Sequence, residues 1–197
     1  MSYRVAVAVS GRGSNLLALC DAPDLGGAEV VLAIADREAP ALAAARARGI
    51  PTVQLNDHRD GAEWLAALHA ARVDLLVLAG FLKLVPLEVV EAFRGRLINI
   101  HPALLPRHGG PGMYGRRVHQ AVLDAGDQES GATVHFADEA YDRGDILGQG
   151  RVPVLPGDTA ESLAARVLAV EHRLLPAAVA AAARAGHPVP FDFPPAA

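Results

Sequence analysis

The chain has 197 residues, the length of one compact domain, and hydrophobic residues make up 51% of it. This composition supplies enough apolar side chains for a sizeable core and excludes a disordered protein. Lys and Arg total 18 against 22 Asp and Glu, so the net charge is -4 with the signs interspersed. Without a basic stripe, nucleic acid is disfavoured as the main partner.

Cysteine usage and hydropathy point to the cytosol. The single cysteine, Cys20, has no internal disulfide partner, and the first residues lead into a strand-like segment rather than a signal peptide. The longest apolar runs, such as Leu75–Leu82, are far shorter than the ~18 residues of a membrane span. We therefore expect a cytoplasmic protein with no membrane partner, present as a monomer or a homodimer.

The first half of the chain alternates between strand-like and helix-like segments. Apolar runs predict five buried strands, and the stretches between them predict four helices. The expected strands are Arg4–Val9, Val30–Ala35, Thr52–Leu55, Asp74–Ala79 and Leu97–Ile100, and the expected helices are Leu16–Ala22, Ala39–Arg48, Ala62–Ala71 and Pro86–Phe93. This alternation predicts an α/β domain with a parallel sheet and right-handed crossovers.

The pattern changes after the fifth strand. The segment His101–Arg117 is rich in Gly and Pro and shows no periodicity, which predicts a long, functional loop. Next come an expected helix, Val118–Ala125, and two strands, Ala132–Phe136 and Ile146–Val154, which we expect to pair antiparallel at the sheet edge. Thr159 is the expected N-cap of a last helix that ends near residue 186, and residues 188–197 are expected to form a loose, proline-rich tail.

The loop after the first strand has the sequence Gly11-Arg12-Gly13-Ser14-Asn15 and leads into a helix. Ligands of open parallel sheets bind beyond the carboxyl ends of the strands, and free N–H groups at a helix start favour a phosphate. The loop lacks the third glycine of the dinucleotide fingerprint and the lysine of the Walker motif. The alternative is a tight turn in which Ser14 is an ordinary helix N-cap.

Two polar side chains stand at the end of the fifth strand. Strand alternation places Asn99 and His101 on the same side of the sheet. A carboxamide N–H next to an imidazole can stabilise an oxyanion and transfer a proton. The alternative is an asparagine that satisfies backbone groups at the strand end and a histidine that only packs.

The loop Asp138–Asp145 offers four carboxylates, most of which are typical of solvated turns. A carboxylate about 4 Å from an imidazolium gains on the order of 4 kcal/mol at an effective dielectric of about 20. We therefore expect one of these carboxylates to keep a histidine protonated at neutral pH.

The other histidines, the single cysteine and the serines are weaker candidates for catalytic or metal-binding residues. We expect four histidines at the surface, namely His58, His69, His119 and His187. No group of His, Cys, Asp or Glu has the spacing of metal ligands, so no metal is expected. No serine lies in a Gly-x-Ser-x-Gly elbow, and nothing in its surroundings activates Cys20, so covalent nucleophilic catalysis is not indicated.

Six segments between Arg4 and Pro176 resemble the folate-dependent formyltransferases, in particular the branch that acts on glycinamide ribonucleotide. They are Ser10–Asn15, Leu78–Leu84, Asn99–Pro106, Gly131–Phe136, Asp142–Leu147 and Glu171-His172. The resemblance implies a Rossmann-like, mostly parallel twisted sheet of about seven strands with helices on both faces. It also implies one formyltransferase domain over residues 1–187.

The resemblance further implies a reaction and a set of site residues. Asn99, His101 and Asp142 would be catalytic as an amine attacks the formyl carbon of 10-formyltetrahydrofolate in purine biosynthesis. The ribonucleotide would be bound by Gly11, Arg12, Gly13, Ser14, Asn15, Glu171 and Arg59, the last aligned across a one-residue gap. The folate would be bound by Leu82, Lys83, Leu84, Val85, Asp138, Glu139, Ala140 and Tyr141.

Other functions share parts of this pattern. A folate deformylase has the same trio, usually with an extra N-terminal region, whereas formyltransferases for initiator methionyl-tRNA or amino sugars normally carry a further domain. A noncatalytic nucleotide-binding module would need only the loop at Gly11. The glycine-rich segment His108–Gly115 is longer than in the family, and it is a candidate lid.

Overall fold

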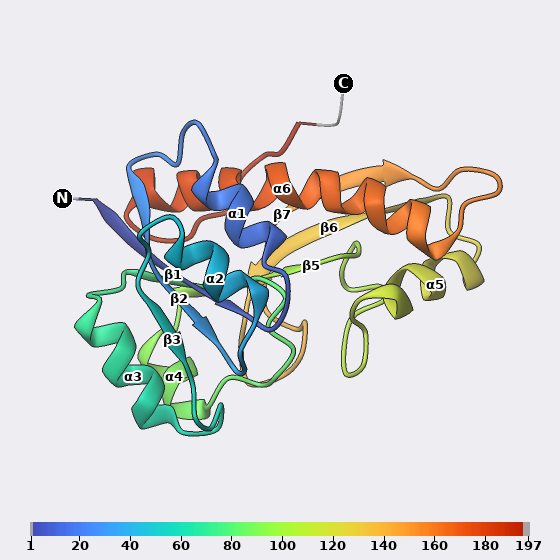
Figure 1. Cartoon of the computed structure of the whole chain (residues 1–197). Coiled ribbons are helices and arrows are strands. Elements are labelled where there is room, and N and C mark those ends of the chain that lie inside the picture. The colour runs from blue at the N-terminus through green and yellow to red at the C-terminus, as the bar shows by residue number, and fades with distance from the viewer. Residues whose placement is uncertain (1, 195–197) are drawn as a thin grey trace.

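The structure is a computed structural model that describes residues 2–194, and a seven-stranded sheet forms its centre (Figure 1). The strands are β1 (Tyr3–Val9), β2 (Ala28–Ala35), β3 (Thr52–Gln54), β4 (Leu75–Leu78), β5 (Leu97–His101), β6 (Glu129–Phe136) and β7 (Ile146–Pro153). Their order is β3-β2-β1-β4-β5-β6-β7. Strands β1 to β5 are parallel, and β6 pairs antiparallel with both β5 and β7. The predicted α/β fold with its antiparallel edge is confirmed.

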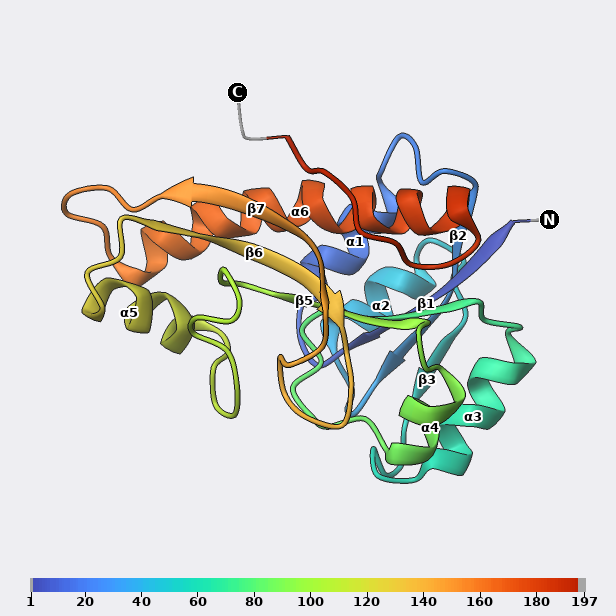
Figure 2. The same ribbon diagram turned by 180° about the vertical axis from the view of Figure 1, so that it is seen from behind.

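Helices cover both faces of the sheet (Figures 1 and 2). They are α1 (Ser14–Cys20), α2 (Pro40–Arg46), α3 (Gly61–Ala70), α4 (Leu87–Ala92), α5 (Arg116–Asp124) and α6 (Ala160–Ala185). One core cluster joins the sheet to α1, α2, α6 and Val122 of α5, and the other joins it to α3 and α4. The central strands are therefore buried on both sides, which is why they are continuous apolar runs in the sequence.

Local sequence signals account for two of the helix starts. The Asp60 side chain accepts hydrogen bonds from the backbone N–H groups of Ala62 and Glu63 and so caps α3. Trp64 of α3 is fully buried and meets Phe81 edge to face, with ring centroids 5.2 Å apart. Thr159 caps α6 as predicted, in a capping box with Ser162.

The chain differs from the sequence prediction mainly at element ends. Strand β6 begins at Glu129 rather than Ala132, because Glu129, Ser130 and Gly131 pair with β7 although these residue types rarely favour strands. Helix α5 begins at Arg116 rather than Val118. The histidine at the end of the fifth strand, His101, belongs to β5.

The C-terminal segment packs instead of lying loose. Phe191 and Phe193 contact the core, and the Phe191 N–H donates a hydrogen bond to the Leu147 carbonyl at 2.9 Å. The expectation of a loose tail is therefore wrong for residues 188–194, and residues 195–197 lie outside the described part. Among the helices of residues 2–194, none has the length and apolar character needed to cross a membrane.

Candidate active site

The site lies where the order of the parallel strands reverses, between β1 and β4. At this edge the Ser10 N–H donates to the Gly80 carbonyl, and the Leu82 N–H donates to the Ser10 hydroxyl oxygen, each at 3.1 Å. The glycine loop after β1 and the segment after β4 are thereby tied together. This reversal point is where open α/β sheets bind their ligands.

Strand pairing brings His135 next to Asn99. The two residues are direct partners across β5 and β6, and Asn99 Nδ2 lies 3.0 Å from His135 Nε2. His135 Nδ1 lies 2.7 Å from the Phe136 carbonyl oxygen, which can only accept, so Nδ1 carries the proton. His135 Nε2 therefore accepts from Asn99 and orients its amide group.

Asp142 reaches the same place from the connection between β6 and β7. Its carboxylate oxygens lie 3.4 Å from Asn99 Nδ2 and 3.4 Å from His101 Nδ1, and 3.5 Å from His135 Nε2. The Gly110 N–H donates to Asp142 Oδ2 at 2.9 Å. The fold thus brings together the three predicted residues Asn99, His101 and Asp142. Asn99 and Asp142 are 43 residues apart in the sequence.

Opposing effects act on the pKa of His101. Its side chain is 4% exposed, and this burial lowers its pKa below the usual range, outweighing the nearby charge of Asp142 and the His108 carbonyl, both of which raise it. Both ring nitrogens face acceptors, the His108 carbonyl oxygen 2.9 Å from Nε2 and Asp142 Oδ2 3.4 Å from Nδ1, so the expectation that a carboxylate keeps this histidine protonated at neutral pH stays a prediction. The Coulomb argument left out the cost of burying the imidazolium.

The Asp142 carboxylate stays ionised. Burial raises its pKa, but the contacts with the His135 and His101 rings and with the Gly110 N–H outweigh that effect and leave the pKa below its usual range. The site therefore combines a carboxylate, an imidazole and a carboxamide.

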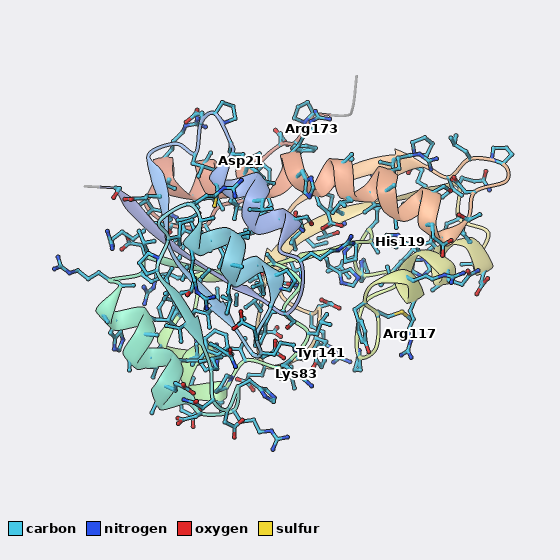
Figure 3. All side chains as sticks on the ribbon, in the orientation of Figure 1. Asp21, Lys83, Arg117, His119, Tyr141 and Arg173 are labelled. Atoms are coloured by element: carbon cyan, nitrogen blue, oxygen red, sulfur yellow. The ribbon has the colours of Figure 1, made fainter. Side chains whose placement is uncertain are left out.

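A small pocket lies next to this cluster and contains most of the expected folate-side residues. Its lining includes Lys83, Leu84, Val85, Asp138, Ala140 and Tyr141, together with Asn99, His135 and Asp142. Figure 3 shows Lys83 and Tyr141 close to each other at this end of the sheet. Leu82 and Glu139 are not among the lining residues, and Leu82 is 42% exposed.

The glycine loop forms the start of α1. Gly13 is the N-cap, with φ of 75° and no side-chain cap, so the alternative that made Ser14 the N-cap is wrong. Asn15 is buried, and its Nδ2 donates to Glu171 Oε2 at 2.6 Å. Arg12 is exposed, as is Arg59 in the connection between β3 and α3. The structure thus joins Asn15 to Glu171 and leaves both arginines at the surface.

Gly13→Ala is expected to destabilise the protein by more than the ~1–2 kcal/mol of placing a side chain in the left-handed region. A Cβ at Gly13 would lie 2.5 Å from the Ala41 Cβ, which real Cβ atoms essentially never show. Gly49→Ala is the matched control, because its φ of 74° is nearly the same and its Cβ would meet no atom within 4 Å. Urea unfolding of both variants measures the difference, and equal losses would contradict the close approach of α2 to this loop.

Glu171 provides a test of stability against pH. Burial raises its pKa, with the Asn15 hydrogen bond acting in the opposite direction. The protonated form is favoured in the folded state, so its contribution is present below the unfolded pKa and is lost as pH rises through the raised folded pKa. Relative to Glu171→Gln, the wild type should therefore lose unfolding free energy over this window, by at most about 1.4 kcal/mol per pH unit. A constant difference between the two proteins would show that Glu171 is not buried in this way.

Two histidines that the sequence did not assign to the site lie near it. His135, described above, forms part of the cluster, and its position opposite Asn99 follows from strand register, which hydropathy does not reveal. His119 on α5 was expected at the surface but is 4% exposed, and its Nδ1 has no hydrogen-bond partner within residues 2–194 (Figure 3). By contrast, His69 and His187 are exposed as expected, and His58 is half-buried.

The fold and the cluster define an α/β protein with a carboxamide, an imidazole and a carboxylate gathered near the carboxyl ends of its parallel strands. A model of the formyl transferase family matches residues 3–179. The chain therefore belongs to the formyl transferase family.

Relatives within this family are similar over most of the chain. A protein of Mycobacterium tuberculosis named phosphoribosylglycinamide formyltransferase is 43% identical, over 93% of this chain and 86% of that protein. A chloroplastic one of Arabidopsis thaliana is 43% identical over 87% of this chain, which spans only 62% of the plant protein. The crystal structure of phosphoribosylglycinamide formyltransferase from Brucella melitensis has a TM-score of 0.81 at 42% identity, covering 92% of this chain and 95% of that one.

Proposed function

We propose that this chain transfers the formyl group of 10-formyltetrahydrofolate to the amine of glycinamide ribonucleotide, a step of purine biosynthesis. The observation that carries the proposal is the convergence of Asn99, His101 and Asp142 beside the pocket at the strand-reversal edge. The names of relatives that are similar over most of the chain support it. Both substrates are small molecules, in keeping with the absence of a basic stripe.

The proposed reaction uses Asn99 as the oxyanion donor. The substrate amine attacks the formyl carbon, a C–N bond forms, and negative charge develops on the formyl oxygen. One Asn99 N–H points to His135, while the other faces Asp142 across a long 3.4 Å contact. The second N–H is therefore free to turn to the formyl oxygen, where its hydrogen bond strengthens as charge develops.

His101 and Asp142 carry out the proton transfer in this reaction. Because burial lowers the pKa of His101, its ring accepts the proton lost by the attacking amine when it is neutral. The imidazolium that forms is stabilised by Asp142, 3.4 Å from Nδ1. The bond from the formyl carbon to N10 of the folate then breaks, and the same proton is delivered to N10, directly or through a water. Charge and protons balance, and no metal is needed for any step.

The two substrates are assigned to the two sides of this cluster. The folate pterin is placed in the pocket, where Leu84 and Val85 offer apolar contacts and the backbone near Asp138–Tyr141 offers hydrogen bonds. The ribonucleotide phosphate is placed on the backbone of Gly11–Asn15, with Arg59 as a further cation and Glu171 for the glycinamide. We also propose that the protein carries out this reaction in the cytoplasm.

A two-substrate assay separates this function from its rivals. Purified protein is mixed with 10-formyltetrahydrofolate, and formation of tetrahydrofolate is followed by absorbance with and without glycinamide ribonucleotide. The proposal predicts turnover only when both are present. Turnover without the amine would identify a deformylase, and no turnover in either mixture would indicate a noncatalytic nucleotide-binding module.

A further inference from the structure

Three polar residues lie in one row across strands β5, β6 and β7. His101 pairs directly with Thr133 in the antiparallel β5–β6 pair, and Thr133 pairs directly with Gln149 in the β6–β7 pair. Side chains of directly opposite residues lie on the same face of a sheet. Thr133 is fully buried, whereas Gln149 is half-buried. The row therefore runs from the edge strand β7 inward to His101.

The two outer residues of this row bind the turn that follows β5. Thr133 Oγ1 donates to the Ala103 carbonyl oxygen at 2.7 Å and accepts from the Leu105 N–H at 3.1 Å. Gln149 Nε2 donates to the Leu105 carbonyl oxygen at 2.9 Å and to Thr133 Oγ1 at 3.0 Å. A threonine hydroxyl has one proton and two lone pairs, so these contacts use all of them. The position of the turn is thus fixed by a hydroxyl and a carboxamide from the neighbouring strands.

The turn at residues 103–105 leads into a segment that contacts two members of the site. The His108 carbonyl oxygen lies 2.9 Å from His101 Nε2, and the Gly110 N–H donates to Asp142 Oδ2 at 2.9 Å. The chain therefore leaves β5 at His101 and returns to the same side chain seven residues later. The turn between these two points determines where the segment returns.

We propose that Gln149 is a positioning residue that acts with Thr133 to fix the turn at residues 103–105. Through this turn it sets the contacts that the following segment makes with His101 and Asp142. Gln149 does not line the pocket assigned to the folate, so its effect on the reaction is on kcat rather than on folate binding. This catalytic consequence rests on the proposed function, whereas the positions of the turn and the segment do not.

A second anchor binds the far end of the same segment. His108 Nε2 lies 2.7 Å from Asp127 Oδ2, and Arg107 pairs with the other oxygen of that carboxylate. Because this anchor remains when the contacts of Gln149 are lost, we expect the segment to shift without unfolding of the domain.

Gln149→Glu tests the proposal, because it keeps the shape of the side chain while an ionised carboxylate cannot donate. Gln128→Glu is the matched control: it makes the same change at an exposed residue whose Nε2 donates to the nearby Gly126 carbonyl oxygen. Hydrogen exchange of the Gly110 amide, measured by NMR on the substrate-free protein, reports whether its bond to the carboxylate persists. We expect exchange at least ~10-fold faster in Gln149→Glu than in the wild type or in Gln128→Glu.

The kinetic expectation for Gln149→Glu is a kcat about 10- to 100-fold lower, because a misplacement of about 1 Å that originates far from the chemistry can cost about 100-fold. The KM of each substrate should stay within about two-fold of the wild-type value, since the variant removes no group from either proposed binding site. A purely structural role would lower the unfolding temperature and leave both kcat of the folded protein and the Gly110 exchange rate unchanged.

A second pair of variants tests the part of Thr133. Thr133→Ser retains the hydroxyl, so the Gly110 exchange rate should stay close to that of the wild type. Thr133→Val retains the branched shape without the hydroxyl, and we expect it to speed Gly110 exchange and lower kcat as Gln149→Glu does.

A Gly110 amide that exchanges at the wild-type rate in both Gln149→Glu and Thr133→Val would overturn the proposal. Faster exchange with an unchanged kcat would overturn its catalytic consequence. Because the exchange measurement needs no substrate, both results differ from a failure of the proposed reaction, in which the wild type itself would not turn over. If Gln149→Glu does not fold, the comparison of Thr133→Ser with Thr133→Val decides the question by the same measurement.

Discussion

Asn99→Ala is expected to lower kcat about 100- to 1,000-fold, the usual cost of removing one oxyanion donor. The fold should survive, because the polar contacts of the Asn99 side chain are with His135 and Asp142 and the residue belongs to neither apolar core cluster of the described residues. Steady-state kinetics with both substrates measures the effect, and thermal unfolding confirms that the variant is folded.

Asn56→Ala is the control for the loss of an asparagine. Its amide group donates a hydrogen bond to the Glu63 carboxylate at the surface. Asn56 follows β3, which is the edge strand at the opposite end of the sheet from β7. This variant should keep nearly full kcat. Near-normal turnover by Asn99→Ala would refute the role of Asn99 as the oxyanion donor.

Asp142→Asn is expected to lower kcat by roughly 100-fold and to move the acidic limb of the pH profile to lower pH. The charge of Asp142 raises the His101 pKa, so its removal lowers that pKa further. Rate rises with pH as His101 becomes neutral and able to accept the amine proton, so the limb follows the pKa downward. Asparagine suits the backbone here, because it tolerates the φ of 57° at this position.

The kcat/KM profile between about pH 4 and 8 measures the shift. His101→Ala provides the reference, because a protein without this imidazole should lack the limb altogether. An acidic limb that stays in place in Asp142→Asn would mean that another group is responsible for it, and the proposed His101–Asp142 pair would lose its support.

Much of the fold follows from side-chain periodicity. Strands covered on both faces must be apolar throughout, so β1, β4 and the end of β2 stand out as continuous runs. The two-residue alternation of a strand also places Asn99 and His101 on one side without knowledge of any neighbour. These features depend only on residues close together in the chain.

Other features depend on contacts that no local pattern encodes. The pairing of Asn99 with His135 follows from the register of β5 on β6, and the position of Asp142 follows from the path of residues 137–145. The lowered pKa of His101 depends on how deeply the ring is buried, which its sequence neighbours do not reveal. The burial of His119 likewise follows from the packing of α5 against the rest of the domain. The proline content of the tail suggested a loose segment, whereas Phe191 and Phe193 determine its packing.

A crystal structure with glycinamide ribonucleotide and a folate analogue that cannot donate its formyl group would test the account most directly. We predict that the substrate amine and folate N10 meet beside Asn99, with the formyl oxygen or its equivalent within hydrogen-bond distance of Asn99 Nδ2. The phosphate should lie on the backbone of residues 11–15. An amine and N10 bound away from Asn99, His101 and Asp142 would contradict the account.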